Sequence, residues 1–409
     1  MRQMAERARG AARELAALSG DERAGLLRGM AAGIDAGTSD ILLANAQDIE
    51  DAKAAGLSGA LVDRLLLTEE RVRAMAAGVR EVAAQRDPLE EVLEEFTRPN
   101  GLVMRKVRAA LGVIVVVYES RPNVTADAAA ICLKAGSAVI LLGGKESLRS
   151  NHAILAAMRG ALEAVPDAAQ MVESSDREAV HALLRMDDVV DLVVPRGGEE
   201  LIRAVAEHAR VPVLKHYKGV CHVYVDGAAD LEMALQIAVN AKCQRPGVCN
   251  AMETLLVAEG VAGAFLPRVG RALRERGVEL RADARAKALL PDAIAASEED
   301  WSTEYLDLIL TVGVVDDVGA AIAHINRYGS NHSDVIVTRD EAAAARFTRE
   351  VDSAVVYVNA SSRFTDGAEF GKGAEIGIST GKLHARGPCG VEELTTYKYV
   401  VTGSGQVRT

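Results

Sequence analysis

Cys249 is the residue of this sequence best placed to act as a nucleophile. It follows a Gln-Arg-Pro-Gly turn at 244–247, between a predicted helix over 230–242 and a predicted apolar strand over 252–257. The proline and glycine end the helix and force a bend, so the thiol stands on a loop with rigid elements on both sides. Arg245 precedes it closely, and cations favour the reactive thiolate. Position alone leaves a second interpretation open, in which Cys249 is a small buried residue.

Asn123 lies at a second turn of interest, where an apolar strand over 111–118 meets a helix predicted over 124–135. Asparagine directly before a helix commonly caps it, and position alone favours that role. The alternative is an amide donor that stabilises an oxyanion during acyl transfer. The residues alone leave both interpretations open.

Two short glycine turns each follow a predicted strand and precede a helix. They are Gly143-Gly144-Lys145 and Arg196-Gly197-Gly198. Glycine lets backbone N–H groups approach a phosphate at a helix N-terminus. Neither turn matches GxGxxG or the P-loop, so each is weak by itself, but two in one sheet point to a nucleotide.

A metal site is not predicted. Cys221, His222, Cys243 and Cys249 lie near one another in the sequence, but their spacing fits no zinc pattern. His222 alternates with apolar residues in a strand, which favours a packed or pocket-lining side chain.

The elements that must position these residues form a strand–helix alternation. Continuous apolar strands separated by helices predict an α/β fold with two parallel-sheet lobes. The strands are predicted at 111–118, 138–142 and 189–194 in the first lobe, and at 254–257, 308–315, 334–337 and 354–358 in the second. The region before residue 92 is helical by pattern, with capping-box spacing from Ser19 to Glu22. Residues 93–108 predict a hairpin around Asn100-Gly101, which must pack on another sheet because a lone hairpin is marginal in water.

Composition limits the classes of function. The chain has 409 residues, too many for one core, and a net charge of −11 argues against nucleic acid as a partner. Its five cysteines show no CxxC spacing, and its N-terminus lacks the apolar core of a signal peptide. The longest apolar run, 109–118, is too short to span a bilayer as a helix. We therefore expect a cytoplasmic protein that does not enter the membrane.

Several long motifs together resemble one family. The sequence is similar to the γ-glutamyl phosphate reductases (glutamate-5-semialdehyde dehydrogenases) of proline biosynthesis, a branch of the aldehyde dehydrogenase superfamily. The resemblance covers essentially the whole chain. Its most specific motifs are YESRPNV at 118–124, VCHVYVD at 220–226, NAKCQRPGVCN at 240–250, VYVNASSRFTDG at 356–367 and GAEIGISTGKLHARGPCG at 373–390.

The resemblance implies an aldehyde dehydrogenase-like architecture with a small β oligomerisation element. The division it implies is a cofactor domain at 1–92 and 109–225, a catalytic domain at 226–370, an oligomerisation hairpin and C-terminal strand at 93–108 and 388–409, and a return segment to the cofactor domain at 371–387. A homo-oligomer, dimer or tetramer, is expected, with glutamate 5-kinase as the pathway partner.

The resemblance also implies roles for single residues. Cys249 is the expected nucleophile and Asn123 the expected oxyanion donor. The substrate-binding candidates are Arg121, Arg245, Arg363 and His384. The cofactor-binding candidates are Gly143, Gly144, Lys145, Arg196, Gly197 and Gly198.

The expected reaction reduces L-glutamyl 5-phosphate through a cysteine thioester to L-glutamate 5-semialdehyde and phosphate. The family uses NADPH and no metal. Leu142 stands where the family commonly has an arginine, so preference for NADPH over NADH is open, and Lys145 offers a replacement charge. Two alternatives remain: a hydrolytic aldehyde dehydrogenase acting on another small aldehyde, and a non-catalytic homologue.

Overall fold

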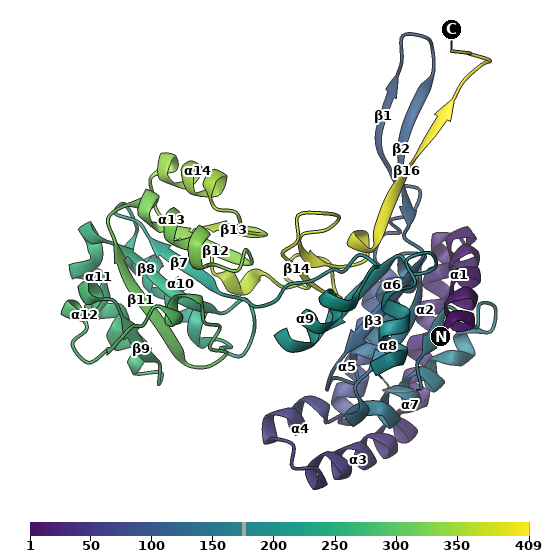
Figure 1. Ribbon diagram of the computed structural model, residues 1–409, viewed down its shortest axis with the longest axis horizontal. Helices are drawn as coiled ribbons and strands as arrows, with labels where there is room; N and C mark the ends of the chain where they lie inside the picture. Colours follow the sequence, from purple (N-terminus) through teal and green to yellow (C-terminus); the bar gives the residue numbers. More distant parts are fainter. Residues whose placement is uncertain (174–176, 409) are drawn as a thin grey trace. The chain divides into compact units, whose positions relative to one another are not determined.

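The computed structural model describes residues 1–173 and 177–408, which divide into two compact units (Figure 1). Unit 1 comprises residues 1–215, 371–378 and 388–409, and unit 2 comprises residues 216–370 and 379–387. None of the described helices combines the length and the apolar character that crossing a bilayer requires.

Unit 1 joins N-terminal helices to a parallel sheet. Its elements are α1 (Arg2–Ala17), α2 (Gly20–Ala36), α3 (Thr38–Ala54), α4 (Gly59–Leu65), α5 (Glu69–Ala84), β1 (Val92–Thr97), β2 (Val103–Ala110), β3 (Val113–Tyr118), α6 (Val124–Lys134), β4 (Ala138–Gly143), α7 (Leu148–Arg159), β5 (Ala169–Met171), α8 (Arg177–Leu184), β6 (Leu192–Arg196), α9 (Glu199–His208) and β16 (Thr395–Thr402). The capping box predicted at Ser19 and Glu22 is confirmed at the start of α2.

The sheet of unit 1 is parallel, as predicted. Among the described residues its strand order is β5-β4-β3-β6, and β3 is buried along its whole length. The third predicted strand, 189–194, is displaced to Leu192–Arg196, because pairing with β3 continues until Tyr118 lies opposite Arg196. The strand therefore carries Arg196 to the edge of the glycine turn that follows.

The predicted hairpin pairs with the end of the chain. β1 and β2 are antiparallel, and β16 pairs with β2 from Thr395↔Ala110 to Thr402↔Val103. Figure 1 shows these strands as a long ribbon extending away from the helices of the same unit. This pairing removes one free edge of the hairpin and confirms the expectation that it does not stand alone.

Unit 2 is built on a larger parallel sheet. Its elements are β7 (Cys221–Val225), α10 (Leu231–Cys243), β8 (Met252–Ala258), α11 (Glu259–Arg274), β9 (Glu279–Ala282), α12 (Ala284–Leu289), β10 (Ile294–Ala295), β11 (Ile309–Val315), α13 (Val318–Tyr328), β12 (Ser333–Val337), α14 (Glu341–Glu350) and β13 (Val355–Val358). In the described part of the chain the strand order is β10-β9-β11-β8-β7-β12-β13. Aliphatic side chains of β7, β8 and β12 form its core with α10 and α11.

The boundaries of the units differ from the expected ones. Residues 216–225 belong to unit 2, because β7 lies between β8 and β12 in the larger sheet, whereas the family resemblance implies that they belong to the cofactor domain. The expected return segment is also divided, with 371–378 in unit 1 and 379–387 in unit 2. A short sheet pairs β14 (Gly377–Ser379) with β15 (Gly387–Cys389) where the chain passes between these segments.

Candidate active site

The turn that carries Cys249 joins the end of α10 to β8, and the Cys249 side chain is half-buried. Gly219 lies directly against this turn, since a Cβ atom placed on it would be 1.8 Å from the carbonyl oxygen of Cys249. The thiol of Cys221 donates to the same oxygen at 3.2 Å. The backbone of the nucleophile candidate is therefore held on one side by residues just before and within β7.

Asn250 fixes the other side of the turn. Its side-chain amide donates to the carbonyl of Thr365 at 2.8 Å, and its own carbonyl accepts from the hydroxyl of Ser362 at 2.7 Å. These bonds join the turn to the short helix η4 (Ser362–Phe364). Because hydrogen bonds of buried groups are costly to break, the turn has little freedom to move.

A buried ion pair connects the two elements on either side of the turn. Lys242, in the last turn of α10, donates to Glu253 of β8 at 2.6 Å, and both side chains are fully buried. Burial lowers the pKa of Lys242 and raises that of Glu253 to about 7. Glu253 also accepts from the backbone of Leu306 at 3.3 Å. This carboxyl group is engaged within the scaffold and is therefore poorly placed to act as a hydrolytic base at Cys249.

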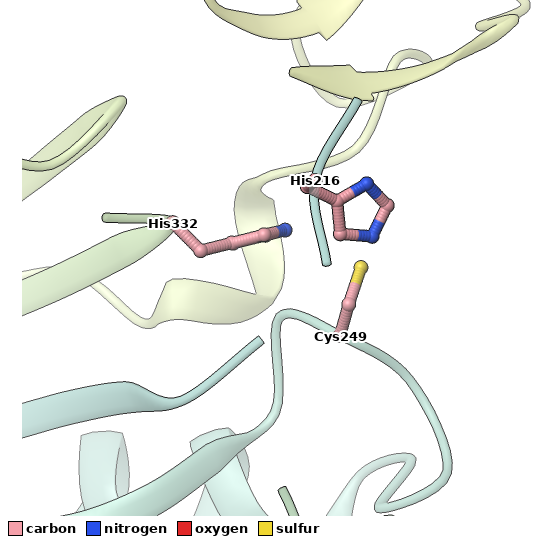
Figure 2. Close-up of side chains that lie close together, drawn as sticks. All are labelled: His216, Cys249 and His332. Carbon is pink, nitrogen blue, oxygen red and sulfur yellow. The ribbon is translucent and has the colours of Figure 1, made fainter. Parts of the chain in front are cut away.

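Two histidines that the sequence analysis did not single out lie beside the thiol (Figure 2). One ring nitrogen each of His216 and His332 and the sulfur of Cys249 lie within 4.8 Å of one another. Burial lowers the pKa of His332 to about 3, with the charge of His216 acting in the same direction, so the His332 ring is neutral. The signal that locates them is sheet order: all three residues precede neighbouring parallel strands, β7, β8 and β12.

Of the substrate-binding candidates, Arg245 and Arg363 gather near Cys249. Burial lowers the pKa of Arg363, the charge of Arg245 lowers it further, and the charge of Cys249 opposes that change. The Arg363 guanidinium donates to Gln244 at 2.8 Å, which directs it along the turn. The charges of these two guanidinium groups act on one another near the turn, and such positive charge favours an anionic ligand. His384 lies exposed between β14 and β15, with φ of +71°.

Asn123 belongs to unit 1, where the favoured capping role is wrong. Asn123 occupies the N-cap of α6, but its side chain makes no capping hydrogen bond in the described chain. Its amide donates instead to the carboxylate of Asp127 at 2.8 Å. Burial raises the pKa of Asp127 to about 6, against the effect of that hydrogen bond. The carboxylate therefore fixes the orientation of the amide, and one amide hydrogen is left for another acceptor. Arg121 lies exposed on the turn just before it.

The Gly143-Gly144 turn follows β4 and approaches its surroundings closely. A Cβ atom on Gly143 would lie 2.1 Å from the amide of Asn151, and one on Gly144 would lie 2.3 Å from the carboxylate of Glu146. That carboxylate accepts from the backbone and the hydroxyl of Ser120, at 2.7 and 2.8 Å. Lys145 lies exposed at the start of the short helix that follows.

The Gly197-Gly198 turn follows Arg196 at the end of β6 and leads into α9. A Cβ atom on Gly197 would lie 2.4 Å from the carboxylate of Glu119, and the N–H of Gly198 donates to that carboxylate at 3.3 Å. Both glycine turns thus lie next to a carboxylate of the chain itself, a feature that the sequence analysis missed. A phosphate that binds the Gly198 N–H must displace Glu119.

Comparisons with known proteins agree on one family. Residues 1–288 match the aldehyde dehydrogenase family. A gamma-glutamyl phosphate reductase of Moorella thermoacetica is 56% identical over 98% of this chain and 97% of its own length. A protein of the same name from Carboxydothermus hydrogenoformans is 55% identical over 99% of this chain and 98% of its own. The crystal structure of gamma-glutamyl phosphate reductase from Thermotoga maritima has a TM-score of 0.98 at 44% identity, covering 100% of this chain and 99% of that one.

Proposed function

The chain belongs to the aldehyde dehydrogenase family, in its γ-glutamyl phosphate reductase branch, and we propose how its residues carry out that branch's reaction. It reduces L-glutamyl 5-phosphate to L-glutamate 5-semialdehyde in proline biosynthesis, with a nicotinamide cofactor. The expected aldehyde dehydrogenase fold is likewise confirmed. The observation that carries the proposed mechanism is the braced, half-buried turn that places the Cys249 thiol near Arg245 and Arg363.

In the first half-reaction, the Cys249 thiolate attacks the γ-carbonyl carbon of the acyl phosphate. A carbon–sulfur bond forms, the bond from that carbon to the phosphate oxygen breaks, and phosphate leaves with its electron pair. The guanidinium groups of Arg245 and Arg363 stabilise the anionic substrate, and Arg121 and His384 are further proposed contacts. Phosphate is a good leaving group, so this half-reaction requires no strong general acid.

In the second half-reaction, the carbonyl carbon of the thioester is reduced and the thiohemiacetal collapses to release the semialdehyde. The proposed role of Asn123 is to donate its amide hydrogen to the oxyanion, and the backbone N–H of Cys249 is the second proposed donor. The bond from Asn123 to Asp127 supports this role, because it orients the amide before substrate arrives. Cys249 returns to its starting state at the end of the cycle.

The glycine turns of unit 1 fit the phosphates of a nicotinamide cofactor, which supplies the hydride when bound. A Cβ atom at Gly143 or Gly197 would require the side chain of Asn151 or Glu119, respectively, to shift. NADPH is the proposed form, with Lys145 and Arg196 as the cations near its phosphates. No metal is proposed as a cofactor of this reaction.

Assembly into a homo-oligomer, a dimer or tetramer, is proposed through the ribbon of β1, β2 and β16. This ribbon exposes several large apolar side chains: Val92, Leu93, Phe96, Tyr397, Tyr399, Val400 and Val401. Exposed apolar surface on paired strands is typical of an interface. The proposed pathway partner is glutamate 5-kinase, whose product has the labile acyl phosphate that Cys249 attacks.

The reverse reaction tests the proposed chemistry. The assay supplies pyrroline-5-carboxylate, which equilibrates with the semialdehyde, and NADP⁺, with and without inorganic phosphate. Strict dependence of NADPH formation on phosphate is expected, because phosphate must cleave the thioester. NADPH formation at an equal rate without phosphate would mean that water cleaves it, and the enzyme would then be a hydrolytic aldehyde dehydrogenase.

A Cys249→Ala variant tests the assigned nucleophile. Turnover should be abolished, because the variant lacks the atom that forms the thioester, while NADPH binding measured by fluorescence titration should persist. Cys243→Ala is the matched control, since it removes another half-buried thiol of unit 2. Measurable turnover in Cys249→Ala would overturn the assignment.

A further inference from the structure

The cluster of Cys249, His216 and His332 has the composition of a transition-metal site. Its sulfur and two imidazole nitrogens, one from each histidine, lie within 4.8 Å of one another, and Figure 2 shows them around a common space. The three residues precede β8, β7 and β12, which are neighbours in the sheet. Their side chains therefore converge from one edge of a rigid, buried sheet rather than from a flexible segment.

His332 supplies a second, independent observation. Its ring is fully buried, and its Nε2 atom has no hydrogen-bond partner among the described residues. The other ring nitrogen, Nδ1, lies 2.9 Å from the hydroxyl of Ser333. Figure 2 shows a ring nitrogen of His332 directed toward the space beside His216 and Cys249. A buried polar atom without a partner is costly, so this atom is suited to receive a ligand.

The surroundings of His332 match those of metal-binding histidines. Such residues donate the hydrogen of one ring nitrogen to a neighbouring oxygen, which leaves the lone pair of the other nitrogen for the metal. Here the Ser333 hydroxyl is that neighbour, and it is itself 2.7 Å from the hydroxyl of Thr365. With Nδ1–H donated to Ser333, Nε2 has its lone pair free toward the cluster.

We propose that Cys249, His216 and His332 bind a zinc-class divalent ion reversibly and that this ion inhibits the enzyme by occupying the nucleophile. On binding, a metal–sulfur bond forms and the thiol proton leaves to solvent. The sulfur lone pair then used by the metal is no longer available for attack on the acyl phosphate. The inhibition rests on the proposed role of Cys249, whereas the metal site itself does not.

The donor set selects the class of ion. Thiolate and imidazole suit zinc and its neighbours in the first transition row, whereas Mg²⁺ and Ca²⁺ prefer oxygen. Within the described chain, no other group of three or more histidine, cysteine, aspartate or glutamate side chains brings its ligand atoms close enough together to hold one metal ion. The thiol of Cys221 donates to the Cys249 carbonyl, and its sulfur lies 3.6 Å from Nδ1 of His332, the ring nitrogen beside Ser333. Three protein ligands leave the fourth tetrahedral position open, and the positive charge of Arg363 near Cys249 opposes a cation, so binding should be exchangeable.

The experiment uses the full-length enzyme after treatment with a chelator. Zn²⁺ is titrated into the reverse reaction, and saturable inhibition at one equivalent, reversed by a chelator and not produced by Mg²⁺, is expected. Binding is measured separately with Co²⁺, whose thiolate-to-metal charge-transfer band should appear in the wild type and be absent in Cys249→Ala. If the band appears while Cys249→Ala retains turnover, the metal site stands and the proposed nucleophile fails.

Histidine variants identify the remaining ligands. His216→Asn and His332→Asn should each raise the Zn²⁺ concentration for half-inhibition at least tenfold, and each should weaken the Co²⁺ band. His208→Asn is the matched control: His208 is a half-buried histidine at the end of α9 in unit 1, so its substitution should leave both readouts unchanged. His216 is only half-buried, so its variant keeps the test valid if His332→Asn fails to fold. Unchanged Zn²⁺ sensitivity in His216→Asn, or Co²⁺ binding without a thiolate band, would overturn the proposal.

Discussion

The two regions that carry the proposed chemistry are held in different ways. In unit 2, the Cys249 turn is braced by buried bonds to its own backbone, from Cys221 on one side and through Asn250 on the other. In unit 1, the glycine turns that suit a cofactor lie against carboxylates of the chain, Glu119 and Glu146. The proposed nucleophile is therefore in place before any ligand binds, whereas a phosphate at the proposed cofactor turns must compete with a carboxylate that is already present.

This difference follows from what each region must do. A nucleophile gains rate from a fixed position, because misplacement by about 1 Å can cost about 10²-fold. A cofactor that enters and leaves in each cycle gains from a site whose resting hydrogen bonds are weak and exchangeable. The 3.3 Å bond from Gly198 to Glu119 is longer and more exposed than the 2.8 Å bond from Asn250 to Thr365. Three substitutions, each with a companion or control variant, separate the two kinds of site.

Asn123→Ala should have the largest effect and asks whether unit 1 also contains a fixed catalytic group. Removing one oxyanion donor typically lowers kcat by about 10²–10³-fold. We expect that loss in kcat with little change in the Kd of NADPH. Asp127→Asn is the companion variant, since it weakens the bond that orients the amide and should lower kcat by a smaller factor. An unchanged kcat in Asn123→Ala would assign the oxyanion to other donors.

Gly219→Ala tests the bracing of the Cys249 turn directly. The added Cβ would lie 1.8 Å from the Cys249 carbonyl oxygen, so the turn or β7 must shift. We expect about 10²-fold loss of kcat, and a changed rate of Cys249 alkylation by iodoacetamide. Gly227→Ala is the matched control, because no heavy atom lies within 4 Å of its added Cβ. Equal behaviour of the two variants would show that the turn tolerates displacement.

Glu119→Gln tests the competition at the cofactor turn. The substitution removes the charge beside Gly198 and keeps the shape of the side chain. A charge of this kind at a helix N-terminus is worth about 0.3–1 kcal/mol, so the affinity for NADPH should rise by roughly two- to fivefold. Glu200→Gln removes an exposed charge from the first turn of the same helix and should change the affinity less. Weaker NADPH binding in Glu119→Gln would mean that this carboxylate supports the cofactor.

The sequence predicts features that depend on local pattern. Continuous apolar strands predict both parallel sheets, and the Ser19–Glu22 spacing predicts the start of α2. The proline-glycine turn correctly places Cys249 between α10 and β8. In each case the deciding pattern lies within a few consecutive residues, so it can be read directly from the sequence.

Features that depend on sheet order were not predictable in the same way. His216 and His332 are 116 positions apart, yet they meet at Cys249 because β7 lies between β8 and β12. The same strand order moves residues 216–225 into unit 2. The capping prediction for Asn123 failed because no backbone N–H of α6 donates to its side-chain oxygen, while its amide donates to Asp127 one helical turn along. The sequence position of Asn123 correctly placed it at the start of α6, but it did not predict that its side chain bonds to Asp127.

The smallest expected effect is a difference in the pH dependence of the two units. Burial, with the charges of His222 and Arg327, lowers the pKa of His324 in unit 2 to about 3 from 6.5. Between these pH values the unfolded chain binds a proton that the folded unit does not. The free energy of unfolding of unit 2 therefore decreases as pH falls, by up to about 1.4 kcal/mol per pH unit. The pKa of Asp127 in unit 1 is raised from 3.8 to about 6. Between these two pH values the folded unit binds the extra proton, so the free energy of unfolding of unit 1 increases as pH falls.

Acid should therefore weaken unit 2 before unit 1, because His324 and His332, whose pKa values are both lowered to about 3, together outweigh the opposite contribution of Glu253, whose pKa is raised to about 7. Trp301, the only tryptophan of the chain, lies edge-on to His324 with ring centroids 4.9 Å apart and reports on unit 2 alone. We expect the urea midpoint measured by Trp301 fluorescence to fall between pH 6 and 4. Over the same range, the hydrogen-exchange protection factors of amides in α6 of unit 1 should rise or stay constant. His324→Gln should reduce the slope of the midpoint against pH, because it removes the group that gains the proton on unfolding. An unaltered slope in that variant would assign the acid sensitivity of unit 2 to other groups, and parallel loss of protection in α6 would show that the two units unfold together.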